Sequence, residues 1–154
     1  MQQVSHSTTI RVNATPDETL PLFTAAGERL WIKEWNPTYI YPETGEPKEG
    51  MIWKTTDDAS IDEIWVTVNY DVTQHTATYV KWSPKNNVTR IDIQCSSIDD
   101  TQTLVQVTYT ITALSDKELI SLEEFTKEHY DSWLRSWERA VNHYLQHGEA
   151  SQIH

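Results

Sequence analysis

The chain has 154 residues, 38% hydrophobic and 23% charged, which is typical of one folded globular domain and excludes a collagen-like or wholly disordered chain. Its formal net charge of −11 makes nucleic acid and anionic membrane surfaces poor partners, so we expect no nucleic-acid binding and no membrane insertion. Seven tryptophans and seven tyrosines against two phenylalanines are more large polar-tipped rings than a small core ordinarily needs.

The first elements are a strand and two short helices. Residues 4–14 alternate between apolar and polar side chains and predict a strand. Thr15-Pro16-Asp17-Glu18 combines a hydroxyl cap, a proline in the first turn and a glutamate three residues after the cap, which predicts a helix start. Pro21 makes this helix short or kinked, and residues 28–32 predict a second short helical piece after Gly27.

The middle of the chain has the pattern of a β meander. Short breaks rich in Pro, Gly, Asn and Asp separate the apolar runs and favour antiparallel hairpins. In the fifth run Ile91, Ile93 and Cys95 share one face and polar residues the other, whereas the inward face of the third run stays open. The predicted strands are Thr38–Tyr41, Met51–Thr56, Asp62–Tyr70, Thr76–Ser83, Val88–Ser97 and Thr103–Thr112.

A long helix is expected at the C-terminal end. Ser115-Asp-Lys-Glu118 is a capping box, Ser121-Leu-Glu-Glu124 is a further candidate, and nothing breaks a helix from there to Gln146. A helix over residues 119–146 would be roughly 42 Å long at about 1.5 Å per residue. Its apolar residues recur at spacings of three and four, so one face packs along its whole length. Residues 149–154 are predicted to form a frayed tail.

These elements predict an α+β fold in which a curved antiparallel sheet wraps around the long helix, because this arrangement buries both apolar faces. With the two short helices after the first strand, this order resembles the START/polyketide-cyclase (SRPBCC) superfamily and its helix-grip fold. The resemblance covers about residues 5–147 of a single domain spanning 1–154, and it is closest to a bacterial and archaeal branch without assigned function. The residues that carry it are Gly27-Glu28-Arg29-Leu30-Trp31, Trp35-Asn36-Pro37, Tyr39-Ile40-Tyr41-Pro42, Trp65, Tyr70-Asp71, Thr112-Ala113-Leu114, Tyr130, Trp133, Trp137 and Tyr144-Leu145.

The resemblance implies a cavity between the long helix and the sheet that takes lipids, sterols, polyketides or other apolar and aromatic ligands. Aromatic rings with an N–H or O–H suit a ligand that is mostly apolar with a few polar atoms. The same rings also suit an ordinary packed core. The residues expected to line the ligand are Trp53, Trp65, Tyr79, Trp82, Tyr109, Phe125, His129, Tyr130, Trp133 and Trp137.

Few titratable residues are candidates for chemistry. His129, one turn before Trp133, and Glu63, in register with Trp65, are weak candidates for moving protons; an exposed helix histidine is the plainer interpretation of His129. Cys95 shares a buried register and is expected to be inert.

Metal and cofactor binding find little support in the sequence. The His143/His147 pair lacks a carboxylate at matching spacing, so we expect no metal site. A lone cysteine excludes an internal disulfide and a multi-cysteine zinc site, and the four scattered glycines form no phosphate-binding loop. No cofactor is expected.

Three functions therefore stay open. The first is binding of a small hydrophobic or aromatic molecule without covalent catalysis. The second is a cyclase, aromatase or dehydratase that uses the same cavity. The third is a protein-interaction domain like the co-chaperone ATPase activators, which share the fold. The absence of a signal segment or long apolar run predicts a cytoplasmic protein. The oligomeric state is not predicted.

Overall fold

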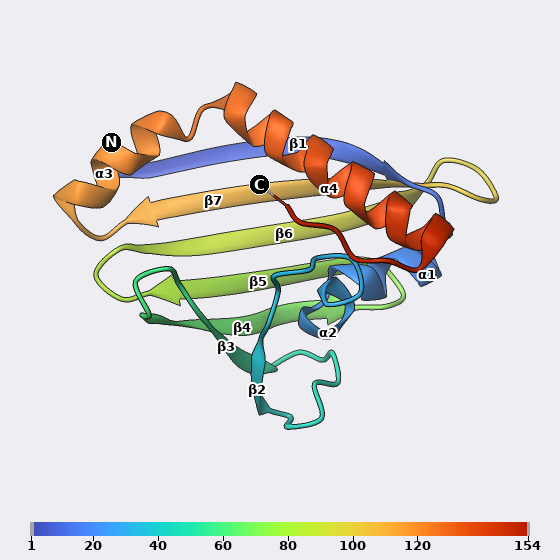
Figure 1. Ribbon diagram of the computed structural model, residues 1–154, viewed down its shortest axis with the longest axis horizontal. Coiled ribbons are helices and arrows are strands. Elements are labelled where there is room, and N and C mark those ends of the chain that lie inside the picture. Colours follow the sequence, from blue (N-terminus) through green and yellow to red (C-terminus); the bar gives the residue numbers. More distant parts are fainter. Residues whose placement is uncertain (1, 154) are drawn as a thin grey trace.

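The computed structural model describes residues 2–153, which form one antiparallel sheet crossed by helices (Figure 1). The sheet has seven strands in the order β1-β7-β6-β5-β4-β3-β2. The chain therefore runs as a meander from β2 to β7, and β1 pairs with β7 at the far edge. The strands are β1 Gln3–Val12, β2 Thr38–Tyr41, β3 Ile52–Thr56, β4 Asp62–Asp71, β5 Thr76–Ser83, β6 Asn87–Ser97 and β7 Thr103–Ala113.

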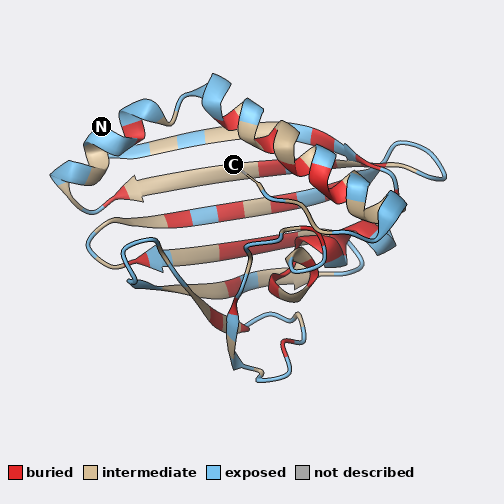
Figure 2. Ribbon diagram, viewed as in Figure 1, coloured by how far each residue is buried: buried red, intermediate tan, exposed pale blue. Residues whose placement is uncertain are grey.

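The concave face of the sheet carries the core, as Figure 2 shows where buried residues alternate with others along β6 and β7. In β6, Ile91, Ile93 and Cys95 are at most 5% exposed while Arg90 and Gln94 are exposed, which confirms the predicted faces. The inward face of β4, which the sequence left open, holds Glu63, Trp65 and Thr67. An irregular register between Thr67 and Asn69 follows them and shifts the pairing of the rest of the strand.

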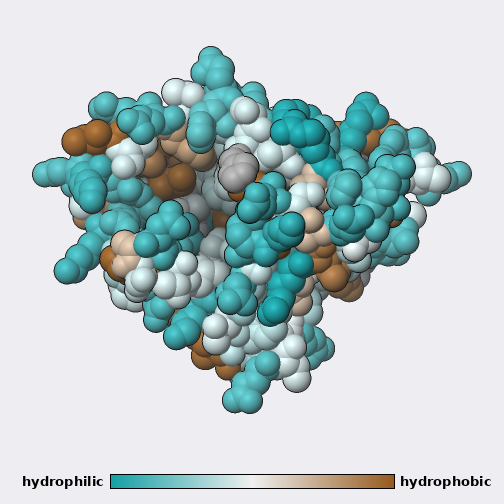
Figure 3. Space-filling model, in the orientation of Figure 1, coloured by the Kyte–Doolittle hydropathy of each residue, from teal (hydrophilic) through white to brown (hydrophobic). Residues whose placement is uncertain are grey.

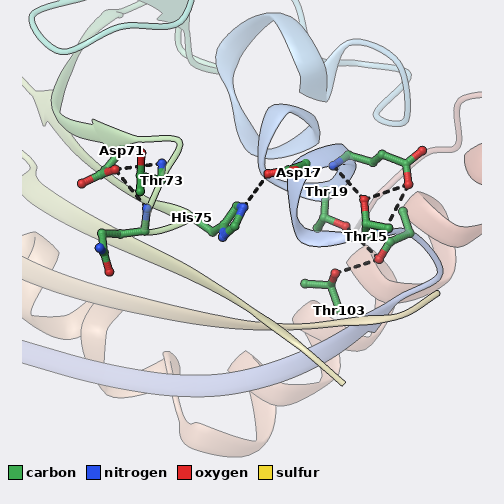
Figure 4. A network of polar contacts seen from close by, with 10 residues as sticks. Thr15, Asp17, Thr19, Asp71, Thr73, His75 and Thr103 are labelled. Atoms are coloured by element: carbon green, nitrogen blue, oxygen red, sulfur yellow. Dashed lines mark hydrogen bonds and ion pairs between the residues drawn. The ribbon is translucent and has the colours of Figure 1, made fainter. Parts of the chain in front are cut away.

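The first helix, α1 (Pro16–Thr19), begins at the predicted capping box. The Thr15 side chain accepts from the Glu18 N–H, and the Glu18 side chain accepts from the Thr15 N–H at 3.2 Å. His75 Nε2 lies 2.6 Å from Asp17 Oδ1, which ties this helix to the turn between β4 and β5 (Figure 4). Thr103 Oγ1 donates to the Ala14 carbonyl at 2.7 Å, so β7 holds the other side of the same corner.

The second short helix is earlier than predicted. After the 3-10 helix η1 (Leu20–Phe23), α2 spans Ala25–Glu28 rather than residues 28–32. The prediction was wrong because the Thr24 side chain caps the helix by accepting from the Gly27 N–H at 3.0 Å.

Gly27 permits α2 to pack directly on η1. A Cβ atom at this position would lie 1.8 Å from the Pro21 carbonyl oxygen, which is backbone and cannot rotate away. We therefore expect Gly27→Ala to lower the free energy of unfolding by about 1–3 kcal/mol or more, the usual cost of overpacking. Urea unfolding followed by far-UV circular dichroism measures this, and unchanged stability would mean that α2 can move away from η1 without loss.

The long C-terminal helix is broken into two, α3 (Asp116–Glu124) and α4 (Lys127–His147), so the prediction of one helix over 119–146 was wrong. Phe125 leaves the helical conformation with φ −84° and ψ 66°, and Thr126 caps α4 by accepting from the His129 N–H at 3.1 Å. The Phe125 carbonyl is bound by His6 Nε2 at 2.7 Å, which holds the break against β1. The predicted caps Ser115 and Gly148 are confirmed.

The C-terminal tail does not fray. Ser151 forms a parallel bridge to Ile32, with the Lys33 N–H donating to Ser151 at 2.8 Å and the Ser151 N–H donating to Trp31 at 3.0 Å. The Ile153 N–H donates to Glu34 Oε1 at 2.8 Å. The prediction of a loose tail over 149–154 was therefore wrong for the described residues, because unpaired backbone groups of residues 31–33 bind it. His154 lies outside the described residues.

α4 lies across the concave face (Figure 1), and buried residues recur along it (Figure 2). These are Tyr130, Leu134, Trp137, Ala140 and Val141, whose spacing of three and four residues confirms the predicted apolar stripe. Across residues 2–153, none of the helices combines the length and apolarity that crossing a membrane requires.

Candidate functional site

A cavity of about 530 Å³ opens between α4, the strands β3–β5 and the segment that follows α2. This volume is within the range that binds drug-sized molecules, about 300–1,000 Å³. Figure 3 shows a recess on this face, with hydrophilic side chains around it. The lining residues are Glu28, Ile32, Glu34, Trp35, Asn36, Thr38, Lys54, Thr55, Thr56, Glu63, Trp65, Lys81, Tyr109, Trp133, Trp137 and Ile153.

Aromatic rings form opposite walls of the cavity. On the helix and β7 side, the Trp133 ring centroid lies 5.0 Å from those of both Trp137 and Tyr109, at interplanar angles of 75° and 74°. On the other side, Trp35 and Trp65 meet edge to face at 5.6 Å. Edge-to-face packing fixes each ring against its neighbour, so the walls are preformed.

The indole N–H groups of the wall formed by Trp35 and Trp65, which we call the outer wall, already have hydrogen-bond partners. Trp65 Nε1 donates to Thr55 Oγ1 at 2.9 Å and Trp35 Nε1 donates to the Ala25 carbonyl at 2.8 Å. These bonds orient the two indoles and leave their ring faces for contact. The outer wall is thus suited to recognise apolar or aromatic surface.

A smaller hollow, about 20 Å³, continues the cavity inward, and we call it the inner hollow. It shares Glu28, Trp65, Tyr109 and Trp137 with the main cavity. Its other lining residues are Phe23, Trp53, Tyr79, Ile91 and Ile93. Glu28 therefore lies where the two spaces meet, at the end of α2.

On the side of the inner hollow the residues around Glu28 are apolar and aromatic. Burial raises the pKa of this carboxyl from 4.5 to about 8, with desolvation as the cause. The pKa values of Tyr79 and Tyr109 are raised too, by their own burial first and then by the negative charge that Glu28 can carry. At neutral pH the inner end of the cavity therefore favours a protonated, uncharged Glu28.

Glu28 was part of the sequence resemblance but was not predicted as a site residue. The direction of the Glu28 side chain depends on the close packing of Gly27 against Pro21, which fixes how α2 is rotated against η1. The sequence shows only one acidic residue between Gly27 and the apolar Leu30-Trp31. In a short surface helix such a residue can point either to solvent or to the interior, so the pattern does not decide between them.

A charged pair lies at the outer part of the cavity. Glu63 Oε2 and Lys81 Nζ are 3.4 Å apart across β4 and β5, and their side chains are 15% and 21% exposed. Lys81 Nζ also lies 5.5 Å from the centre of the Trp65 ring, which is within cation–π range. Lys54 pairs with Asp62 at 3.5 Å, and Glu34 accepts from the tail backbone.

The structure brings together a part of the predicted site. Trp65, Tyr109, Trp133 and Trp137 line the cavity, and Glu63 lies with them as its register with Trp65 suggested. Trp53 and Tyr79 line the inner hollow. Contact of any of these residues with a ligand stays a prediction.

The cavity does not include three predicted residues, one at the break before α4 and two in its first turn. Tyr130 is fully buried core, and its hydroxyl donates to the Val107 carbonyl at 2.5 Å. Phe125 packs at the helix break against His6, with ring centroids 5.3 Å apart. His129 is exposed, because the break at Phe125 restarts the helix and turns this position to solvent.

Trp82 was predicted to line the cavity and lies instead on the opposite face of the sheet. It is 49% exposed and pairs with Ile64 and Val88, which are on the outer face of their own strands. Strand side chains alternate with a period of two, so Trp82 and Tyr79, three residues apart, cannot share a face. The parity was readable in the sequence.

Other candidate reactive groups lie outside the cavity. Burial raises the pKa of the Cys95 thiol to about 12, which disfavours the nucleophilic thiolate. The His143 and His147 rings lie 4.7 Å apart at the end of α4. Within residues 2–153, no group of three or more His, Cys, Asp or Glu side chains is arranged to hold a metal ion.

Comparison by structure identifies several similar solved proteins. Norcoclaurine synthase from Thalictrum flavum, solved in complex with dopamine and hydroxybenzaldehyde, gives a TM-score of 0.65 at 9% identity, covering 94% of this chain and 88% of that one. The Zhui aromatase/cyclase from Streptomyces sp. R1128 gives 0.66 at 11% identity, with 97% and 99% covered. An uncharacterised protein from Bacillus thuringiensis gives 0.59 at 17% identity, with 93% and 99% covered.

Comparison by sequence gives no match, either among protein-family models or among curated proteins. The structural likenesses are at low identity and concern the fold. They confirm the predicted helix-grip fold, a curved antiparallel sheet around a C-terminal helix with short helices after the first strand. The narrower resemblance to one bacterial and archaeal branch stays a prediction.

Proposed function

We propose that the protein binds a small, mainly aromatic molecule in the cavity between α4 and the sheet. The observation that carries the proposal is an open cavity of about 530 Å³ whose lining includes four tryptophan rings and the Tyr109 ring, together with polar and charged side chains. Concave sites of this size that combine aromatic walls with a few polar groups are typical of small-molecule binding. The aromatic ligands of norcoclaurine synthase support the same ligand class.

Proton-transfer catalysis in the same cavity is the second candidate. The Glu63–Lys81 pair and the partly buried Glu28 place acidic and basic groups beside the aromatic walls. A group with a perturbed pKa in a cavity, as Glu28 is here, is typical of active sites and also occurs in binding sites. A product formed from a bound ligand would distinguish this candidate from simple binding. The interior position of these groups favours both candidates over an interaction domain that uses an outer face.

A cytoplasmic location stays a prediction.

Binding can be tested through the intrinsic fluorescence of the tryptophans. We expect at least one aromatic member of a panel containing a fatty acid, a sterol, a flavonoid and naphthalene derivatives to give a saturable change with one site per chain. Trp133→Ala should weaken the affinity about tenfold, because the ring supplies contact area and an edge-to-face partner. No saturable binding by any aromatic member would contradict the proposal.

Trp82→Ala is the matched control, because it removes the same side chain from the outer face of the sheet. Its affinity for the aromatic ligand should equal that of the natural protein. Equal losses in both variants would place binding outside the cavity.

A further inference from the structure

We infer that the inner hollow recognises a hydrogen-bond-accepting oxygen of the ligand, a carbonyl conjugated to its aromatic body, through donors supplied by Glu28, Tyr109 and Trp53. This inference rests on the proposed function and specifies the ligand class for the same cavity. The donors come from α2, β7 and β3, which are distant in sequence and meet only at this end of the cavity.

Trp53 supplies the first independent observation. The residue is 2% exposed, and its Nε1 is the one buried side-chain nitrogen or oxygen in the described part of the chain without a hydrogen-bond partner. Buried N–H groups in native proteins nearly always have an acceptor, so an unpaired one in the wall of a hollow is available to a ligand or water. An indole N–H only donates, and its partner must therefore be an acceptor.

Glu28 supplies the second donor. The groups that face it are Tyr109 on β7 and Tyr79 on β5, both uncharged, and the Tyr79 hydroxyl already donates to the Phe23 carbonyl at 2.7 Å. The charged residues of the same cavity are Lys54, Glu63, Lys81 and Glu34. Lys54 is paired with Asp62, Glu63 and Lys81 with each other, and Glu34 with the tail. Desolvation in the inner hollow raises the pKa of the Glu28 carboxyl to about 8, which favours its protonated form at neutral pH, and a protonated carboxyl can donate to an oxygen.

These groups discriminate among ligand chemistries. A carboxylate ligand would place its charge in the same apolar hollow that keeps Glu28 neutral, at a high desolvation cost. An ammonium ligand would need an ionised Glu28 and would leave the Trp53 N–H without an acceptor. A neutral carbonyl oxygen accepts from more than one donor and leaves no new charge, while its conjugated rings lie between the Trp65 and Trp133 walls.

The test compares prodan, an acylated dimethylaminonaphthalene, with its analogue in which a propyl group replaces the propionyl group. At about pH 6.5 we expect the natural protein to bind the ketone at least about tenfold more tightly than the propyl analogue, as measured by probe fluorescence. Glu28→Leu should abolish most of this preference. Glu28→Gln should retain it, because the amide keeps one donor and one acceptor in the same shape.

The pH dependence separates a donating from an accepting Glu28. In the natural protein the preference for the ketone should fall as the pH rises through about 8, since ionisation removes the donor, whereas Glu28→Gln should show no such fall. Tyr109→Phe, which keeps the ring and removes the hydroxyl, should weaken ketone binding severalfold. Circular dichroism of each variant establishes that it is folded.

The outcomes distinguish this inference from the proposed function. Equal affinities for ketone and propyl analogue, unchanged in Glu28→Leu, would overturn the inference and leave aromatic binding intact. Ketone affinity that rises above pH 8 would overturn it in favour of an ionised Glu28 that accepts from a cation. Failure of both probes and of the aromatic panel to bind would overturn the proposed function, and the inference with it.

Discussion

Between about pH 5 and pH 8.5, Glu28→Gln is expected to gain up to about 4 kcal/mol in free energy of unfolding relative to the natural protein. The Glu28 carboxyl has a pKa of about 8 in the folded chain against 4.5 ordinarily. Between these values the folded state holds a proton that the unfolded chain releases, so the stability of the natural protein falls as pH rises and levels off above the folded pKa. Each pH unit in that range costs about 1.4 kcal/mol, and glutamine does not titrate.

Urea unfolding of the two proteins at a series of pH values measures this difference directly. Contributions from histidines and other carboxylates are common to both proteins and cancel. Glu149→Gln, an exposed substitution in the tail, is the control and should change stability by less than about 0.5 kcal/mol at every pH. A difference between Glu28→Gln and the natural protein that stays constant with pH would mean that Glu28 is hydrated in the folded state.

The strands and the fold were predictable because their signals are local. Alternating side chains fix the two faces of β6, turn residues fix the ends of the hairpins, and capping residues such as Thr15 and Ser115 fix helix starts. Trp133 and Trp137 were predictable as cavity residues because they lie four apart on one face of α4. The helix break was missed because Thr126 is a good cap only once Phe125 leaves the helix, and a contact from His6 on β1 holds it there.

The chemistry of the site was less predictable because it depends on contacts between distant segments. The position of Glu28 follows from Gly27 against Pro21, and Ile153 lines the cavity because its tail is bound to residues 31–34. Neither contact has a periodic pattern in the sequence. The prediction that His129 lines the cavity was wrong for a related reason, since the direction of this side chain depends on where α4 begins.

Trp31→Ala is expected to lower the free energy of unfolding by about 3–5 kcal/mol, the usual cost of removing a large ring from a packed core. Trp31 is 0% exposed, and its ring centroid lies 5.5 Å from Phe23 and 5.7 Å from Trp137. Its Nε1 donates to the Leu22 carbonyl at 2.6 Å, so the substitution also removes the donor that fixes η1. Trp31→Phe should lose less, because most of the ring contact remains.

Trp82→Ala should cost less than about 1 kcal/mol, because the ring is 49% exposed on the outer face. Urea unfolding compares the two tryptophans under the same conditions, and equal losses would mean that the outer face is packed as tightly as the core. Trp31 also supports Trp137, which lines the cavity. Trp31→Ala should therefore weaken binding of an aromatic probe even under conditions in which the variant is fully folded, whereas Trp82→Ala should not. Loss of both stability and binding in Trp31→Ala would mean that the ring contacts that stabilise the core also hold Trp137 in the cavity wall.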